Sequence, residues 1–398
     1  MKNYFLVTSL LFAVLYTVCS ADTFKHKSKD IVYHGYAKQE LVNGKNIIVT
    51  PENETLELNL AEYDVENNST GRNNFVSLLS ITDGIELDFE TKIFEESIVE
   101  EADKGPLFIL IEIDTPGGNI GLCKRLCAAI TNLRYCQTFI YIKGGKNGGA
   151  FSAGAAVSLA CNKIYMAPAT SIGAATSIII GSDGHISDMK ETFGETVGEK
   201  FNSAWRSYFA SLAQEHNRSG AIAKAMVDKD ISVVEVDRGG KRLFVESKDQ
   251  RPDDISVRTL CKRGELLTLS ATEALSCHVA DAVVESRQAM LIEAGFPNAP
   301  VIECEKLVQA KEEFEKVVRK FKKLNERLDL KFKELEAQYA NHSLTQSQAL
   351  RSYEAIIKNA EYLLKLKRSY SDIPYEEEDL ISAINSLKAR YTAIKSMR

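Results

Sequence analysis

The feature that most constrains the fold is an alternation of apolar strands and amphipathic helices between about residue 75 and residue 295. Short apolar runs typical of buried strands are "NFVSLLSI" (74–81), "PLFILIEID" (106–114), "QTFIYIKG" (137–144) and "NKIYMAP" (162–168). The segments "ETKIFEESIVEEADKG" (90–105) and "GLCKRLCAAITNLR" (121–134) lie between them and have helical spacing of apolar residues. Strands that alternate with helices predict βαβ units and a mostly parallel sheet with packed helices.

Two turns of this predicted sheet are rich in glycine, and functional sites gather at such turns, after the carboxyl ends of parallel strands. They are "DTPGGN" (114–119) and "GGAFSAG" (148–154). The second begins the stretch "GGAFSAGAAVSLACNKIYMAPATSIGAA" (148–175), which places Ser152 among small residues. Small residues let a ligand approach the backbone closely, but they also let a helix pack tightly on a sheet. From the residues alone, Ser152 is either a nucleophile or part of a close-packed core.

A serine nucleophile needs hydrogen-bond donors for the oxyanion that forms during acyl transfer. The amides of Gly117 and Gly118 follow a predicted strand, and their missing side chains leave room for a substrate carbonyl. The amide of Ala153 begins a predicted helix, whose dipole would favour negative charge there. We therefore expect the oxyanion hole at Gly117, Gly118 and Ala153.

The nucleophile also needs a base, and lysine serves only when burial lowers its pKa from about 10.4 towards 7–8. The segment "ETVGEKFNSAWRSYFASLAQEHNR" (195–218) predicts a helix, with Lys200 near its start. We expect partial desolvation of Lys200, because it borders an apolar stripe formed by Phe201, Trp205, Tyr208 and Leu212. The histidines near this region are interpreted as surface residues, and no metal site is predicted.

Three motifs in order resemble the Clp-fold, crotonase-like serine proteases of the NfeD and signal-peptide-peptidase kind. They are "LIEIDTPGG" (110–118), the 148–175 stretch and "GELLTLSATEALSCHVADAVV" (264–284), within roughly residues 75–290. The resemblance implies that Ser152 is the nucleophile, that Lys200 is its base and that the amides of Gly117 and Ala153 hold the oxyanion. It implies hydrolysis of peptide bonds without ATP, metal or other cofactor.

The resemblance also has limits. The position of the Clp protease's histidine falls on Ala175, which favours a Ser–Lys dyad over a Ser-His-Asp triad. Longer NfeD proteins carry membrane helices and a small β-barrel after the protease, whereas this chain continues with a helical segment. Substrates and partners therefore do not carry over.

From about residue 303 the chain has the heptad spacing of a long helix or coiled coil, at Leu307, Phe314, Phe321, Leu328 and Leu335. Two further helices are predicted, one around residues 350–364 and one around 380–391. Two interpretations remain open: a small antiparallel bundle packed on the enzyme domain, or a coiled-coil arm for oligomerisation or docking of a protein partner.

The chain begins with "MKNYFLVTSLLFAVLYTVCSADTF", in which a lysine precedes a short apolar run and a small-residue cleavage site. We predict a signal peptide at 1–20, a polar lead-in at 21–74, a protease domain at 75–300 and a helical region at 301–398. The mature protein is expected to be exported, to the periplasm or outside the cell, or to stay membrane-associated if the signal is uncleaved.

The combined expectation is an exported serine endopeptidase that acts on a peptide or protein substrate and forms a homo-oligomer. A formal net charge of −6 gives no reason to expect a nucleic-acid partner. The alternatives are a crotonase-type acyl-ester hydrolase or transferase, which would use the same oxyanion turns, and a catalytically inactive scaffold that acts through its C-terminal helices.

Overall fold

The computed structural model describes residues 22–42, 44–50, 54–66, 73–133, 136–180 and 186–397. The predicted signal peptide at 1–20 lies outside the described residues. The chain divides into two compact units. The first comprises residues 1–83, 98–117 and 127–303, and the second comprises residues 84–97, 118–126 and 304–398.

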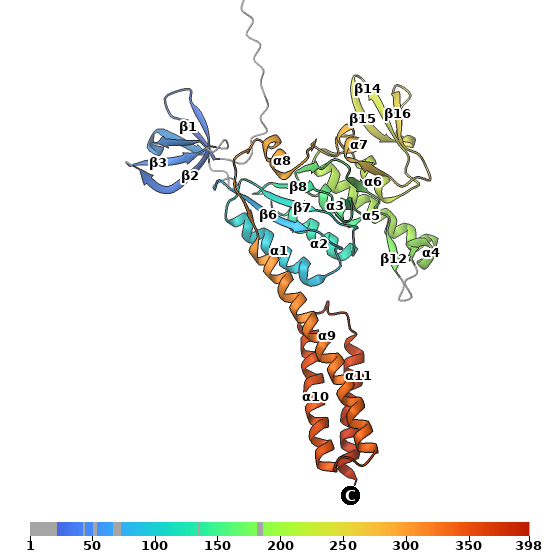
Figure 1. The fold of residues 1–398 in the computed structure, drawn as a ribbon. Helices are drawn as coiled ribbons and strands as arrows, with labels where there is room; N and C mark the ends of the chain where they lie inside the picture. Colours follow the sequence, from blue (N-terminus) through green and yellow to red (C-terminus); the bar gives the residue numbers. More distant parts are fainter. Residues whose placement is uncertain are drawn as a thin grey trace, which may run out of the picture. The chain divides into compact units, whose positions relative to one another are not determined.

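A six-stranded sheet forms the centre of the first unit (Figure 1). In spatial order its strands are β18 (Ala282–Val283), β10 (Lys163–Met166), β8 (Thr138–Ile142), β7 (Ile109–Ile113), β6 (Val76–Ile81) and β19 (Val301–Glu303). Every neighbouring pair is parallel, so the predicted parallel sheet is confirmed. Strand β19 extends this sheet to Glu303, beyond the boundary expected at residue 300.

The sheet is buried because apolar residues fill both of its faces. Every residue of β7 and β8 is buried, which is typical of a parallel sheet covered on both sides by helices. Phe108 stacks on Phe139 with ring centroids 4.3 Å apart, and Phe296 packs beside Phe108 at 5.5 Å. The chain connections contribute helices α1 (Asp88–Asp103), α2 (Ile120–Thr131) and α8 (Arg287–Glu293).

A smaller, three-stranded sheet carries the serine turn. Its order is β17 (Thr268–Ser270), β11 (Ser171–Gly173) and β9 (Gly149–Phe151), with β9 and β11 parallel. Helix α3 (Ala153–Leu159) follows β9 after the single residue Ser152, and all seven of its residues are buried. The small side chains of 148–175 therefore do build a tightly packed helix, as one of the two interpretations required.

Between residues 178 and 276 the first unit contains further elements around this core. They are β12 (Ile178–Ile180), β13 (Ile186–Asp188), α4 (Met189–Phe193), α5 (Glu195–Glu215), α6 (Gly220–Val227), β14 (Val233–Arg238), β15 (Lys241–Glu246), η2 (Ser247–Asp249), β16 (Ile255–Cys261) and α7 (Ala271–Ser276). Strands β14, β15 and β16 form an antiparallel sheet in the order β15-β14-β16.

Residues 22–66 lie within the polar lead-in (21–74) that we expected to be either poorly ordered or rich in β-structure, and they contain a five-stranded antiparallel sheet. Its order is β4 (Thr55–Leu58), β3 (Lys45–Val49), β2 (Val32–Val42), β1 (Asp22–His26) and β5 (Tyr63–Glu66). The two edge strands are joined by residues 59–62 alone, which include the short helix η1 (Leu60–Glu62). Such a short connection requires the sheet to curl, and Phe24 and Ile48 are buried inside it.

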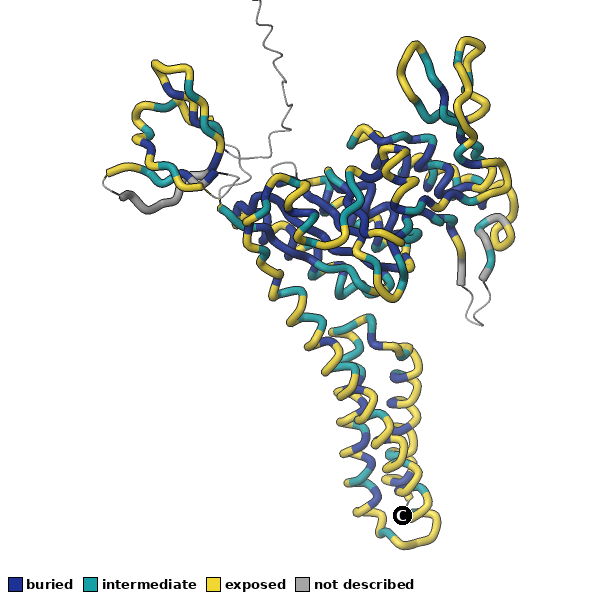
Figure 2. Tube along the Cα trace, turned by 45° about the horizontal axis from the view of Figure 1, so that its top comes forward, coloured by how far each residue is buried: buried dark blue, intermediate teal, exposed yellow. Residues whose placement is uncertain are grey.

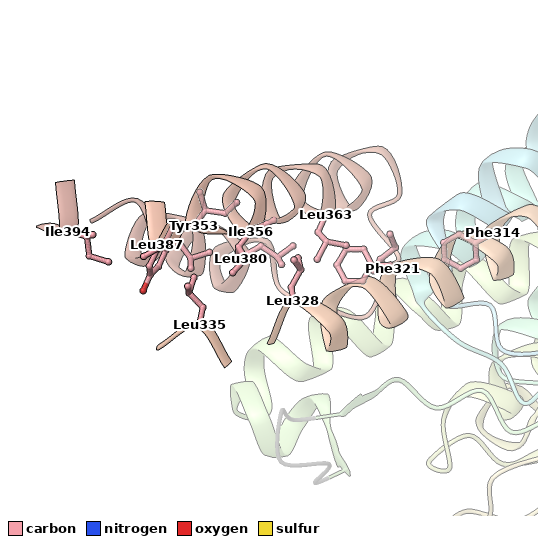
Figure 3. Packing of buried hydrophobic residues seen from close by; sticks show 14 residues of the cluster. Phe314, Phe321, Leu328, Leu335, Tyr353, Ile356, Leu363, Leu380, Leu387 and Ile394 are labelled. Carbon is pink, nitrogen blue, oxygen red and sulfur yellow. The ribbon is translucent and has the colours of Figure 1, made fainter. Parts of the chain in front are cut away.

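The second unit contains the three long C-terminal helices, α9 (Glu305–Ala340), α10 (Gln346–Ser369) and α11 (Glu377–Ser396). On α9 the buried residues recur every seventh position at Phe314, Phe321, Leu328 and Leu335. Figure 3 shows Phe321, Leu328 and Leu335 beside residues of α10 and α11, including Tyr353, Leu363 and Leu387, whereas Phe314 lies beside α1. The apolar seam predicted from the sequence is thus covered by the chain's own helices, as in a small bundle.

The first half of α1 packs within this second unit. The ring of Phe89 stacks on Phe314 with centroids 5.0 Å apart, and Lys306 pairs with Glu96 at 3.0 Å. The carboxylate of Asp372 accepts hydrogen bonds from the amides of Asp88 and Phe89 at 3.1 and 2.7 Å, and so caps the start of α1. Figure 2 shows a buried stripe along each of the three C-terminal helices. Within the described ranges, no helix has both the length and the apolar character required to cross a bilayer.

Candidate functional site

Ser152 has a backbone conformation that non-glycine residues rarely adopt. Its φ is 51° and its ψ is −117°, at the junction between β9 and α3. Its amide donates to Gly173 O at 2.9 Å, which ties the junction to β11. The side chain does not cap the helix that it precedes, and its Oγ makes no hydrogen bond with any other described residue. Ser152 as a whole is half-buried.

The turn after β7 lies directly against this serine. A Cβ at Gly117 would come within 2.5 Å of Ser152 Cβ and 3.0 Å of its Oγ, so only glycine fits there. The amide of Gly117 donates to Thr115 Oγ1 at 3.1 Å, and Thr115 Oγ1 donates to Asp83 O at 2.6 Å. The amide of Gly118 makes no hydrogen bond within the described part of the chain.

Lys200 lies in the second turn of α5, but its environment differs from our expectation. Its side chain is exposed, and it makes no hydrogen bond or ion pair with another residue among those described. The expected stripe is also only partly right, because Trp205 and Leu212 are buried whereas Phe201 is 50% exposed. The buried face of α5 includes Phe209 and Ala213 rather than Phe201 and Tyr208. Lys200 therefore lies outside the buried face, and the desolvation that we expected for it is not observed.

Helix α5 nevertheless contacts the same short segment as the serine turn. Trp205 Nε1 donates to Ala175 O at 3.0 Å, and the amide of Ser152 donates to Gly173 O at 2.9 Å. Helices α3 and α5 also pack against each other. Since a helix rises 1.5 Å per residue, the Cα of Lys200 lies about 7 Å along α5 from Trp205. The structure therefore brings the helix that carries Lys200 next to the turn that carries Ser152.

Within the described residues, Cys136, Cys161 and His216 are unsuited to this role. Ala175 is fully buried, so the place of a Clp-type histidine holds no base. Burial raises the pKa of the Cys136 and Cys161 thiols to about 12, which keeps both protonated and unreactive. Burial also lowers the pKa of His216, which contacts Ala160 O. No cluster of three metal-ligating side chains occurs among the residues that the structure describes.

Sequence reasoning missed one residue of this region, Asp114. It follows β7 immediately, is buried, and binds the glycine-rich loop that precedes β9. The signal available in the sequence was an acidic residue placed directly after a wholly apolar strand in "LIEIDTPGG". A carboxylate at that position is costly to bury unless hydrogen bonds compensate for the lost water.

The central part of this chain matches a known protein family. Residues 75–252 match the family described as NfeD1b, N-terminal domain. Among curated proteins, membrane protein NfeD1b of Bacillus subtilis (strain 168) is 26% identical over 205 residues, which cover 52% of this chain and 38% of that protein. Membrane-bound protease PH1510 of Pyrococcus horikoshii is 32% identical over 127 residues, which cover 31% of this chain and 26% of that protein. The chain thus matches less than half the length of either relative.

Solved structures similar to this chain include two variants of the 1510-N membrane-bound stomatin-specific protease. A serine-to-alanine variant has a TM-score of 0.42 and 23% identity, covering 58% of this chain and 97% of that one. A lysine-to-alanine variant in complex with a substrate peptide has a TM-score of 0.42 and 22% identity, covering 58% and 91%. A ClpP1 variant from Listeria monocytogenes has a TM-score of 0.31 and 15% identity, covering 54% and 94%. Residues 75–252 of this chain are therefore similar to the NfeD1b N-terminal domain.

Proposed function

We propose that this chain, whose residues 75–252 carry the NfeD1b-type domain, is a serine endopeptidase with Ser152 as its nucleophile. The observation that carries the proposal is the strained turn at Ser152, with its unbonded hydroxyl packed against Gly117. A non-glycine residue at positive φ costs about 1–3 kcal/mol, and such strain persists mainly where function requires it. A serine on a sharp strand-to-helix turn is also the arrangement by which several hydrolases expose a nucleophile.

In the proposed reaction Lys200, as the neutral amine, takes the proton of Ser152 Oγ while the oxygen attacks a peptide carbonyl. The amide of Ala153 donates to the oxyanion, and Gly117 supplies the space beside the serine. The protonated lysine then gives its proton to the leaving amine, which leaves an acyl group on Ser152. Water, deprotonated by the same lysine, hydrolyses that ester and restores the serine.

Because Lys200 is exposed, the proposed mechanism requires that the bound substrate exclude water from the Lys200 amine. Three apolar side chains near Lys200 are unusually exposed for their type, namely Phe193 at 52%, Val197 at 44% and Phe201 at 50%. A peptide that covers them would also remove water from around Lys200, and desolvation favours the neutral form of an amine. A preference for peptides with apolar residues next to the cleaved bond follows from this arrangement.

The proposed location and partners follow from the N-terminal sequence and from the related proteins. The basic and apolar residues of 1–20 favour export, and both curated relatives are named as membrane proteins or membrane-bound proteases. One related structure holds a substrate peptide, which favours a peptide or protein substrate here. We propose that the C-terminal helices serve assembly or the selection of folded substrates, since they contain no residue of the proposed dyad.

The deciding experiment is labelling with a fluorophosphonate probe, located by mass spectrometry. Wild-type protein should be labelled on Ser152 and should hydrolyse short peptides, whereas Ser152→Ala should do neither while remaining folded. Ser158→Ala is a matched control, because Ser158 lies on the adjacent helix α3 and its hydroxyl donates to Gly154 O at 2.8 Å. Peptide hydrolysis that persists in Ser152→Ala would refute the proposal, and turnover of thioesters without peptide hydrolysis would favour an acyl-ester hydrolase.

A further inference from the structure

The glycine-rich loop before Ser152 is organised around one buried carboxylate, that of Asp114, which is 4% exposed. Asp114 Oδ1 accepts a hydrogen bond from the amide of Gly149 at 3.1 Å, and Oδ2 accepts one from the amide of Asn147 at 3.0 Å. The Asn147 side chain donates to Asp114 O at 3.0 Å and to Oδ2 at 3.4 Å. Four hydrogen bonds therefore join the end of β7 to residues 147 and 149.

The loop backbone curves closely around this carboxylate. Gly145 has a φ of 150°, and a Cβ there would come within 2.7 Å of Asp114 Oδ2. Glycine-rich segments lose more backbone entropy on ordering than other segments do, so this path needs strong attraction to be held. Hydrogen bonds from backbone amides to an ionised carboxylate supply it, because they are roughly twice as strong as bonds between neutral groups.

Backbone hydrogen bonds connect Gly149 to the turn that carries Ser152. The amide of Thr115 donates to Gly149 O at 2.8 Å, and the amide of Phe151 donates to Thr115 O at 3.1 Å. Strand β9 is therefore held by residues 114–115 on one side and by β11 on the other, and Ser152 is the next residue. The strained φ of Ser152 can persist only if flanking contacts fix it in this way.

We infer that Asp114 is a positioning residue for Ser152: its carboxylate orders residues 144–149 and so holds the nucleophile in the reactive turn. This inference rests on the proposed function of Ser152. It gives Asp114 a different role from the acid of a catalytic triad, because its carboxylate binds loop amides and the Asn147 side chain rather than a base.

Asp114→Asn tests the inference with little change in shape. The new amide keeps one acceptor oxygen but turns an N–H₂ group towards a backbone amide that also donates. We expect kcat to fall about 10- to 100-fold, as for a small displacement of a reacting group, with KM unchanged. The rate of fluorophosphonate labelling should fall by the same factor. Glu101→Gln is the matched control, since Glu101 is also 4% exposed and accepts a bond from Ser77 Oγ at 2.8 Å.

Two further measurements keep the inference open to refutation. The inference is overturned if folded Asp114→Asn protein has the same kcat as the wild type. If that variant does not fold, Asn147→Ala removes only the two side-chain bonds and should lower kcat a few-fold, so that an unchanged kcat overturns the inference. If the wild type is neither labelled nor active, the proposed function fails separately. Amide exchange of residues 144–152 then decides: faster exchange in Asp114→Asn than in Glu101→Gln supports the ordering role, and equal exchange overturns it.

Discussion

The serine-bearing core and the C-terminal helices differ in how often their non-glycine residues adopt unusual backbone conformations. Six non-glycine residues in the described ranges have positive φ. Three of them, Asn217, His278 and His342, directly follow the C-cap residues of α5, α7 and α9, where left-handed backbone commonly ends a helix. The other three, Ser152, Ala169 and Ala174, lie within one short stretch of the core and end no helix of this kind.

The C-terminal helices, by contrast, are built from regular local structure. Their buried residues follow heptad spacing, and α10 begins with a capping box between Thr345 and Gln348. Unusual backbone is therefore concentrated where the proposed chemistry lies, and regular backbone is found where only packing is required. If this contrast is right, substitutions of the proposed catalytic residues should alter rate more than stability, and substitutions in the bundle should do the reverse.

The largest effect is expected for Lys200→Ala. Loss of the proposed base should lower kcat/KM about 10⁴-fold, roughly 5 kcal/mol of transition-state stabilisation, with no loss of stability. In the wild type the rate should rise with pH, because only the neutral amine accepts a proton. Steady-state kinetics across neutral and alkaline pH would measure both effects. Lys224→Ala, which alters a lysine of α6 paired with Glu246, is the control. If Lys200→Ala remains active, Lys200 is not the base.

The next largest effect is expected for Phe321→Ala in the bundle. Phe321 is fully buried and packs against Tyr375 with ring centroids 4.8 Å apart. Removing a buried phenylalanine side chain costs about 3–5 kcal/mol. Thermal unfolding should show this loss, whereas hydrolysis of a short peptide below the transition should not change. A large fall in kcat would show that the two regions are not independent. A point variant is preferable to truncation at residue 299, which would also delete strand β19.

A smaller effect is expected for the buried Glu112 in the core sheet. Burial tends to raise the pKa of Glu112, but hydrogen bonds from Arg287 at 2.5 Å and Lys143 at 3.1 Å outweigh it and hold the pKa below 4.5. A lowered carboxyl pKa contributes stability at neutral pH that is lost as pH falls below 4.5. Glu112→Gln should cost about 1.5–3 kcal/mol at pH 7, and less in acid. Denaturant unfolding at several pH values measures this, and a cost independent of pH would contradict it.

The smallest effect is expected for Ala360→Leu. Ala360 is 8% exposed and lines a pocket of about 490 Å³ between the C-terminal helices, together with Leu328, Phe332 and Leu387. A larger apolar side chain should fill part of this volume and raise stability by up to about 1 kcal/mol. Chemical denaturation of wild type and variant would detect the gain. A marked loss of stability would mean that the pocket closes in solution and that the new side chain is overpacked.

The sequence by itself determined the features that depend on local spacing. Apolar runs seven to nine residues long predicted the parallel sheet, and the seven-residue spacing from Phe314 to Leu335 predicted the buried seam of α9. The run of small residues around Ser152 marked the turn of the candidate site. These patterns can be recognised in the sequence because a helix or a strand buries its apolar residues only if they recur with the period of that element.

Only the tertiary structure decided the features that depend on residues far apart in the chain. The contact of Gly117 with Ser152, and the four hydrogen bonds of Asp114 with residues 147 and 149, each span more than thirty residues. The exposure of Lys200 likewise depends on which face of α5 packs on the core, and the edge strand β19 joins β6 from more than two hundred residues away. No local period encodes such pairings, because they arise only when separate elements compete for the same buried surface.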